Sequence, residues 1–345
     1  MRVLLGESLR SCNSLALASR ASAVARVTTD DELRHACSWA VDRGLPLIPL
    51  GEGSNVVLAG DLDALVVRQE SKGIEQLNDG AGQVKLRIAA GENWHALVRW
   101  TLQQGLYGLQ NLALIPGKVG AAPIQNIGAY GVELASVVQA VHAVTVPDAR
   151  PIVLSATDCE FGYRDSVFKH ALQDKVVITA LDLCLSQSPC VDIGYPALAD
   201  FLAEKGVASP TPEDVFEAVV SIRRSKLPDP AVEPNAGSFF KNPLLDAQQA
   251  KELTRRFSSL PTYPQEDGRV KLPAAWLIDY CGWKGFRKDN IGIHPHHALV
   301  VVNYGNDSGA CLLSLAREVA ASVADTFGVK LAIEPRIYGW HDDRF

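Results

Sequence analysis

The chain has 345 residues, 47% of them hydrophobic and 21% charged, with a formal net charge of −6 and seven cysteines that form no Cys-x-x-Cys pair. This composition allows a large core in two or three domains, and it argues against a dedicated nucleic-acid binder, a disulfide framework and a zinc site. Because an acid, Glu7, comes too early for a signal-peptide core and no apolar run reaches about 18 residues, we expect a cytoplasmic protein that does not enter a membrane.

The N-terminal half predicts alternating helices and strands. Residues 28–44 are typical of a helix that Thr28 or Thr29 caps and Gly44 ends. Residues 93–104 predict an amphipathic helix, because their apolar side chains recur at helical spacing. Strands are expected at residues 45–50, 65–68, 84–89, 137–146 and 176–185.

The C-terminal half begins after a change in composition. Residues 189–212 are rich in Pro and Ala, which predicts a domain boundary within them. Thr211 is placed to cap the helix that follows. We expect helices at residues 212–224, 276–280 and 311–327, and strands at residues 297–303 and 330–339.

Two glycine-rich stretches are candidates for binding an anion. Residues 51–55, Gly-Glu-Gly-Ser-Asn, follow a predicted strand and can present N–H groups to a phosphate, although an ordinary tight turn has the same composition. Residues 115–131 contain four glycines, two prolines and no acid, which suits a pyrophosphate but also an ordinary surface loop. Neither stretch matches G-x-G-x-x-G or the P-loop pattern.

Three further residues are candidates for chemistry, each with a simpler structural interpretation. Ser238 follows Asn-Ala-Gly but lies outside a G-x-S-x-G elbow, so a turn or cap serine is the simpler interpretation. Glu334 lies among apolar residues, where an acid is costly to bury unless it is paired, yet the Pro at 335 allows an edge strand with a solvated Glu. Arg164 can pair with Asp165. The histidines at 294, 296 and 297 lack metal-ligand spacing, so no metal is predicted.

Taken together, six segments resemble the UDP-N-acetylenolpyruvoylglucosamine reductase family, flavoenzymes that complete UDP-N-acetylmuramate in bacterial peptidoglycan synthesis. They occur in the family's order and extend over nearly the whole chain, from residue 13 to residue 339. The segments are residues 51–55, 115–131, 161–166, 226–230, 235–243 and 334–336.

The resemblance implies an α+β fold without a Rossmann domain. It places a PCMH-type FAD-binding domain of two α/β lobes at residues 13–188 and a Tyr-bearing insertion or linker at residues 189–212. An α+β substrate-binding domain follows at residues 213–345, and its last strand can pack back on the FAD domain. A monomer is expected.

The resemblance also implies roles for individual residues. Ser238 is the proton donor, with Arg164 and Glu334 beside the enolpyruvyl group of the substrate. Tyr195, Lys226 and Asn242 contact the UDP-sugar in the family's long-loop type. Non-covalent FAD binding is assigned to Gly51, Gly53, Ser54, Asn55, Pro116, Gly117, Gly120, Ala121, Pro123, Gln125, Asn126, Ile127, Gly128, Ala129 and Arg223.

The implied reaction is a ping-pong cycle with NADPH as co-substrate. Hydride passes from NADPH to FAD and then to C3 of the enolpyruvyl group of UDP-N-acetylglucosamine enolpyruvate, and Ser238 protonates C2. The pathway supplies the cell wall and so supports cell shape and division. The chain departs from the family pattern at Ala275, at His297 and at Pro335, which follows Glu334 rather than preceding it.

Two other classes of function are weighed against this one. An oxidase with covalently linked FAD is disfavoured, because residues 115–131 contain neither His nor Cys. A non-catalytic nucleotide-binding protein would use the glycine-rich stretches without the chemistry of Ser238. Turnover separates that class, because such a protein would oxidise no NADPH.

Overall fold

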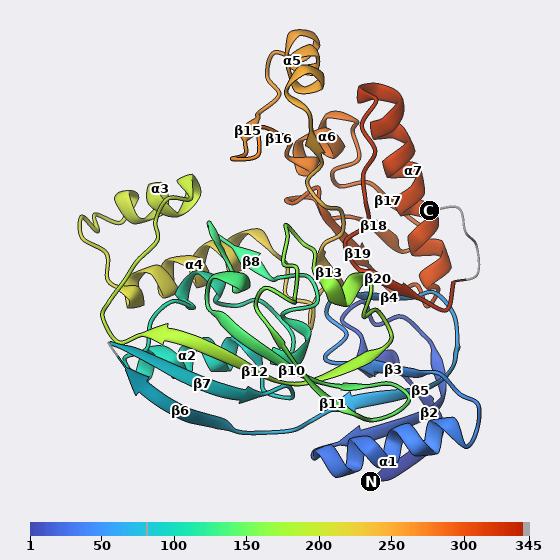
Figure 1. Ribbon diagram of the computed structural model, residues 1–345. Helices are drawn as coiled ribbons and strands as arrows, with labels where there is room; N and C mark the ends of the chain where they lie inside the picture. Colours follow the sequence, from blue (N-terminus) through green and yellow to red (C-terminus); the bar gives the residue numbers. More distant parts are fainter. Residues whose placement is uncertain (81, 341–345) are drawn as a thin grey trace. The chain divides into compact units, whose positions relative to one another are not determined.

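The computed structural model describes residues 1–80 and 82–340 (Figure 1). Within this part, the chain forms two compact units. The first unit comprises Met1–Glu7, Ala21–Gly53 and Asp63–Ser225, and the second comprises Ser8–Arg20, Ser54–Leu62 and the chain from Lys226 onward. Both units contain helices and strands, so the fold is α+β as predicted. Among the described residues, no helix is both long enough and apolar enough to cross a membrane.

The first unit begins with a sheet covered by α1 (Asp30–Val41). The Thr29 side chain accepts a hydrogen bond from the Glu32 N–H at 3.2 Å, so Thr29 rather than Thr28 caps this helix. Apolar residues of α1 pack on the strands in a small core of their own. The strand order is β1 (Arg2–Ser8), β2 (Arg20–Val27), β5 (Leu62–Gln69) and β3 (Leu47–Leu50), with β3 parallel to β5.

The larger sheet of the first unit is antiparallel (Figure 1). Leu181, Leu183 and Leu185 alternate with polar residues along β12, so one face of the sheet is apolar. Residues of three helices, α2 (Trp94–Gln103), α3 (Pro196–Glu204) and α4 (Pro212–Lys226), join that face in the main core. The strand order is β11 (Pro151–Ser155), β10 (Val138–Thr145), β12 (Val176–Ser186), β7 (Gln83–Ala89) and β6 (Ile74–Gly80).

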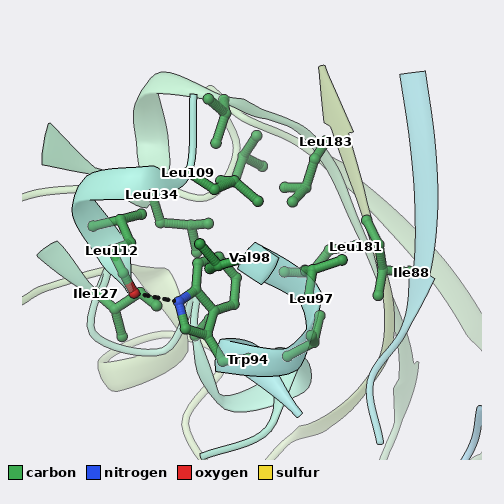
Figure 2. Packing of buried hydrophobic residues seen from close by; sticks show 14 of the residues in the cluster. Ile88, Trp94, Leu97, Val98, Leu109, Leu112, Ile127, Leu134, Leu181 and Leu183 are labelled. Atoms are coloured by element: carbon green, nitrogen blue, oxygen red, sulfur yellow. Dashed lines mark hydrogen bonds between the residues drawn. The ribbon is translucent and has the colours of Figure 1, made fainter. Parts of the chain in front are cut away.

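Trp94 is the largest side chain at the centre of this core, and it is fully buried (Figure 2). It packs among Leu97, Val98 and apolar residues of the sheet. Its indole N–H donates to the Leu112 carbonyl at 2.9 Å, which satisfies a polar atom that would be costly to bury alone. This bond fixes the chain just before residues 115–131 against α2.

The opposite face of the sheet carries a buried acid, Asp182, whose side chain is 2% exposed. Arg87 donates two hydrogen bonds to it, at 2.7 and 2.9 Å, and Lys85 and His142 lie 3.3 and 3.2 Å away. Burial raises the pKa of the Asp182 carboxyl, but the hydrogen bonds from Arg87 and the nearby imidazole of His142 outweigh burial and hold that pKa at about 2. The ionised carboxylate therefore connects three adjacent strands.

The second unit has its own core between a sheet and two helices, α6 (Ala274–Tyr280) and α7 (Gly309–Phe327). The sheet order is β13 (Asn235–Ser238), β19 (Val300–Asn303), β18 (Ile291–Ile293) and β17 (Arg287–Lys288), all antiparallel. Smaller elements are β14 (Leu244–Leu245), α5 (Ala247–Arg256), β15 (Tyr263–Pro264) and β16 (Val270–Lys271). The last strand, β20 (Arg336–Tyr338), pairs in parallel with β4 (Val56–Leu58).

Three predicted segments differ in the structure. The last strand is shorter than residues 330–339 and excludes Glu334, because Pro335 has no N–H for a continuous ladder. The strand predicted at 297–303 begins at Val300, since the preceding residues form a turn. Residues 189–212 contain α3, whose Leu198 and Leu202 are buried in the core of the first unit. That unit extends to Ser225, while the functional division at residues 189–212 stays a prediction.

Candidate active site

The first part of residues 115–131 is hydrogen-bonded to the residues that connect β7 to α2 and to the start of α2. The Trp94 N–H donates to the Gly117 carbonyl at 3.0 Å, and the Val119 N–H donates to the Glu92 carbonyl at 2.9 Å. The Gly120 N–H donates to the Ala90 carbonyl at 2.9 Å, and a Cβ at position 120 would lie 2.6 Å from the Ala90 Cβ. Gly120 is therefore required by the close approach of two backbones.

These bonds change the interpretation of the stretch. The N–H groups of Gly117, Val119, Gly120, Ala121 and Ala122 all donate to acceptors within the protein. They are therefore not available to a pyrophosphate in this arrangement. At these positions a ligand can approach small residues closely, but the backbone N–H groups do not donate hydrogen bonds to it.

Asn126 likewise uses its side chain within the protein. Its Nδ2 donates to the Glu133 carboxylate at 2.7 Å and to the Gly162 carbonyl at 3.1 Å, and its Oδ1 accepts the Ala135 N–H at 2.9 Å. The residue is 1% exposed and has a φ of +43°. Asn126 thus holds the stretch in place through bonds within the protein. Its assignment to FAD stays a prediction.

Arg164 reaches the same stretch. Residues 128–133 form a hairpin of β8 (Gly128–Ala129) and β9 (Val132–Glu133), and Arg164 Nη2 donates to the Gly128 carbonyl at 2.8 Å. A Cβ at position 128 would lie 3.1 Å from Arg164 Nη1 and 3.0 Å from Glu133 Cγ. Close contacts on two sides therefore favour glycine at position 128. The structure brings a predicted catalytic residue and predicted FAD-binding residues together.

Arg223 of α4 carries a buried donor that lacks a partner. Although the residue keeps some exposed surface, its Nε is fully enclosed and has no hydrogen-bond partner among the described residues. Burial lowers the pKa of the guanidinium, Tyr130 opposes that shift, and the positive charge of Arg164 adds to it. An unsatisfied buried donor is costly, and an anionic ligand beside Arg223 would remove that cost.

Tyr195 lies next to the end of the stretch. Its ring meets the Tyr130 ring edge to face, with centroids 5.4 Å apart, and 45% of the residue is exposed. The preceding segment is held by two buried amides. Gln110 donates to the Cys190 carbonyl at 2.6 Å, and Asn111 donates to the carbonyls of Asp192 and Tyr130, both at 2.9 Å. Sequence reasoning missed both amides, whose signal is a polar pair between apolar residues just before residue 115.

Ser238 and the backbone of Glu334 lie close together at the end of β13. Ser238 is the last residue of that strand and pairs with Val300. Its hydroxyl makes no hydrogen bond within residues 1–80 and 82–340. The Glu334 N–H donates to the Phe239 carbonyl at 2.9 Å, so the backbone of Glu334 lies beside the residue after Ser238. Both Ser238 and Glu334 are half-buried.

Two asparagines shape the segment around Ser238. The side chain of Asn235 donates to the carbonyls of Pro228 and Glu233, and it accepts the Gly237 N–H at 2.8 Å. Asn242, predicted to contact substrate, accepts the Ala274 N–H at 2.9 Å through Oδ1. This bond positions Asn242 against the start of α6, and a role in substrate binding would fall to its NH₂ group.

The histidines of the second unit form no metal centre in the described part of the chain. His297 Nδ1 accepts the Leu299 N–H at 3.3 Å, and His294 Nε2 lies 3.6 Å from the Glu233 carboxylate. Burial lowers the pKa of His297, and positive charge from His294, Lys226 and Lys284 adds to that shift. His297 is therefore favoured in its neutral form.

The predicted site residues thus fall into two groups. Arg164, Arg223 and Tyr195 belong to the first unit, together with residues 51–53 and 115–131. Ser238, Glu334, Asn242 and Lys226 belong to the second unit, together with Ser54 and Asn55.

Two family models match different parts of the chain. Residues 21–155 match a family model described as an FAD binding domain, so the chain is an FAD-binding protein. Residues 229–338 match the model described as UDP-N-acetylenolpyruvoylglucosamine reductase, C-terminal domain.

Relatives named UDP-N-acetylenolpyruvoylglucosamine reductase match almost the whole chain. The protein from Pseudomonas aeruginosa is 46% identical over 331 residues, which cover 96% of this chain and 97% of the relative. The one from Chromobacterium violaceum is 46% identical over 330 residues, which cover 95% and 97%. The chain belongs to the UDP-N-acetylenolpyruvoylglucosamine reductase family of FAD-containing oxidoreductases, as the resemblance predicted.

A solved structure agrees at the level of the fold. The crystal structure of UDP-N-acetylenolpyruvylglucosamine reductase from Thermus caldophilus has a TM-score of 0.65 and 24% identity, and the match covers 98% of each chain. The prediction of an α+β protein with an FAD-binding domain and a distinct C-terminal domain is therefore confirmed.

The first unit has one feature that fits FAD. The buried Nε of Arg223 has no partner among the described residues and needs an acceptor, and FAD carries a diphosphate and a ring system with several acceptors. This feature agrees with the match of residues 21–155 to an FAD-binding domain.

Proposed function

We propose that the protein reduces UDP-N-acetylglucosamine enolpyruvate to UDP-N-acetylmuramate, with NADPH as the source of hydride and non-covalently bound FAD. Family membership over almost the whole chain supports this reaction. The observation that carries the FAD assignment within the fold is the buried Arg223 Nε, which has no partner among the described residues and whose guanidinium interacts electrostatically with Tyr130 of the 115–131 stretch. When bound, FAD supplies a carrier that takes hydride from NADPH and returns it to C3 of the enolpyruvyl group.

Ser238 is proposed to donate the proton that C2 requires. A serine hydroxyl is a weak acid in water, but it is adequate toward a strongly basic enolate at hydrogen-bond distance. Its position at the end of β13 fixes its backbone, and its hydroxyl makes no hydrogen bond within the described residues. Both properties suit a donor that binds substrate rather than its own protein.

Arg164 and Glu334 are proposed to stabilise the negative charge that develops on C2 and the adjoining carboxylate. Preorganised donors of this kind contribute about 3–4 kcal/mol each to transition-state stabilisation. The bond from Arg164 to the Gly128 carbonyl holds its guanidinium in one orientation. Glu334 acts in its protonated form, and its backbone bond to Phe239 keeps it beside the segment that carries Ser238.

The remaining residues are proposed to bind ligands. Tyr195, Lys226 and Asn242 hold the UDP-sugar, with Lys226 on the diphosphate. FAD is held by residues of the 51–55 and 115–131 stretches together with Arg223. Because residues 117 and 119–122 use their N–H groups internally, they contribute shape, and hydrogen bonds to the diphosphate come from other groups.

The visible spectrum of the purified protein and its turnover test this proposal. We expect a yellow protein that releases FAD on denaturation and oxidises NADPH beyond the one equivalent that reduces FAD only when the enolpyruvyl substrate is present. FAD that stays attached after denaturation would favour the covalent class. Binding of UDP-sugar without oxidation of NADPH would favour the non-catalytic class. A colourless protein that cannot be reconstituted with FAD would contradict the proposal outright.

A further inference from the structure

Glu52 lies within the 51–55 stretch. A negative charge there would repel the diphosphate of FAD if the stretch bound it. The Glu52 carboxylate is instead engaged by three groups of the first unit. Oε2 accepts the Gly117 N–H at 3.1 Å, and Oε1 accepts Asn93 Nδ2 at 3.1 Å. Lys118 Nζ lies 3.7 Å from Oε1. Each contact joins the first glycine-rich stretch to a segment that is far from it in the sequence.

Gly117 depends on this contact for its conformation. Its φ is +115°, a value that L side chains rarely adopt, and the residue follows Pro116. Its N–H donates to Glu52, and its carbonyl accepts the Trp94 N–H at 3.0 Å. Both polar groups of its peptide backbone are therefore fixed, one by Glu52 and the other by the start of α2.

The side chain of Asn93 forms hydrogen bonds with both α2 and Glu52. Its Oδ1 accepts the Ala96 N–H at 2.9 Å, which caps the helix, and its NH₂ group is left to donate to Glu52. The backbones also approach closely, since a Cβ at Gly51 would lie 3.5 Å from Lys118 Cγ and 3.9 Å from Ala121 Cβ. The Glu52 bridge, defined as Glu52 with Asn93, Gly117 and Lys118, thus ties three segments together.

We propose that Glu52 is a positioning residue that holds the two glycine-rich stretches in their FAD-binding arrangement before FAD arrives. The inference rests on the proposed assignment of both stretches to FAD. Hydrogen bonds to an ionised carboxylate are stronger than neutral ones, and the side chain of Glu52 is only 34% exposed. The ion pair with Lys118 adds less, because its long contact is partly solvated.

Loss of the bridge is expected to weaken FAD binding without a direct contact being lost. If a segment becomes ordered only when FAD binds, only a fraction of the FAD-free protein is in the conformation that binds FAD. The apparent affinity for FAD is then reduced in proportion to that fraction. Removal of a carboxylate that accepts two hydrogen bonds corresponds to about 10- to 100-fold weaker binding for Glu52→Ala. Glu52→Gln keeps an acceptor for Gly117 but loses the charge, so its loss should be smaller.

The test compares hydrogen–deuterium exchange of the FAD-free protein with its affinity for FAD, measured by flavin fluorescence. Variants Glu52→Ala, Glu52→Gln and Lys118→Met are compared with the wild type. Glu70→Ala is the matched control, because it removes an ion pair with Arg26 elsewhere in the first unit. We expect faster exchange at residues 115–121 and weaker FAD binding in the order Ala, Gln, Met, with thermal midpoints close to that of the wild type.

Several results would overturn the inference. Weaker FAD binding with unchanged exchange at residues 115–121 would make Glu52 a direct ligand, and faster exchange with unchanged affinity would remove its connection to FAD. A lowered thermal midpoint without a change specific to residues 115–121 would assign Glu52 a general structural role. If Glu52→Ala does not fold, equal affinities for wild type, Glu52→Gln and Lys118→Met refute the inference. A wild type that binds no FAD refutes the proposed function as well, which distinguishes the two failures.

Discussion

Residues 115–131 and the end of β13 differ in how their polar atoms are bonded. In residues 115–131 of the first unit, backbone N–H groups and the Asn126 side chain are bonded within the protein. At the end of β13 in the second unit, the Ser238 hydroxyl makes no hydrogen bond within the described part of the chain. A cofactor that stays bound through many cycles is best served by a preformed backbone. A substrate that enters and leaves needs side-chain donors that are free to bind it.

The largest effect is expected for Ser238, at the end of β13. Ser238→Ala should leave reduction of FAD by NADPH nearly unchanged, because that step needs no proton from Ser238. Reoxidation by the enolpyruvyl substrate should slow about 10²- to 10⁴-fold, the usual contribution of general acid catalysis. Stopped-flow absorbance of the flavin, with each substrate in turn, measures both steps.

Ser238→Cys provides a graded control for the same experiment. It retains a proton at nearly the same reach, so its reoxidation rate should fall between those of wild type and Ser238→Ala. Equal slowing of both half-reactions in Ser238→Ala would show that Ser238 shapes the site rather than donating the proton.

The next prediction concerns the preformed backbone of residues 115–131. Gly128→Val should lose FAD, because a Cβ there meets Glu133 Cγ at 3.0 Å and Arg164 Nη1 at 3.1 Å. We expect a loss of affinity for FAD of at least about 100-fold, since the backbone has to shift by several tenths of an ångström. Flavin content after purification and reconstitution measures it.

Gly80→Val is the matched control for Gly128→Val. Gly80 lies in β6, and a Cβ added there meets no atom within 4 Å. This variant should purify with a full complement of FAD. If a folded Gly128→Val protein kept its FAD as well, the close approach at residue 128 would have no part in the binding of FAD.

A smaller effect is expected where a long side chain binds substrate. Lys226→Ala should reduce kcat/KM for the UDP-sugar substrate about 10- to 150-fold, which corresponds to one charge-assisted hydrogen bond of about 1.5–3 kcal/mol. Reduction of FAD by NADPH should not change. Lys251→Ala, an exposed lysine on α5, is the control. Steady-state kinetics that match the wild type in Lys226→Ala would refute the assignment.

The smallest expected effect concerns the stability of the first unit on which the preformed stretch depends. Asp182→Asn should lower the free energy of unfolding at pH 7 by about 2 kcal/mol, because Arg87 and Lys85 lose a buried anion. The folded pKa of about 2 is below the ordinary value of 3.8, so the ionised form is favoured in the folded state. This contribution is therefore present above about pH 4 and is lost as the pH falls toward 2.

Urea unfolding between pH 7 and pH 2.5 measures both parts of this prediction. The stability difference between wild type and Asp182→Asn should be largest at neutral pH and should shrink in acid. Asp148→Asn removes a longer, exposed contact with Arg150 and should behave like the wild type at every pH. A difference that is independent of pH would show that packing rather than charge accounts for the loss.

From the sequence alone, four of the helices and the family could be predicted. Apolar periodicity and end signals placed α1, α2, α4 and α7 close to their observed bounds, because helix formation depends on residues three or four apart. The family followed from six motifs in order, and those motifs also selected Ser238, Glu334 and Arg164. Such signals lie within short stretches of the sequence, so they can be found without the tertiary structure.

Only the tertiary structure decided which partner each polar group has. Glu52, Asn126 and Asp182 are each engaged by segments distant in the sequence. Glu334 likewise comes beside Phe239 through a backbone bond that no local pattern encodes. The physical reason is that hydrogen bonds and ion pairs act over a few ångströms, and the fold alone brings distant residues within that range.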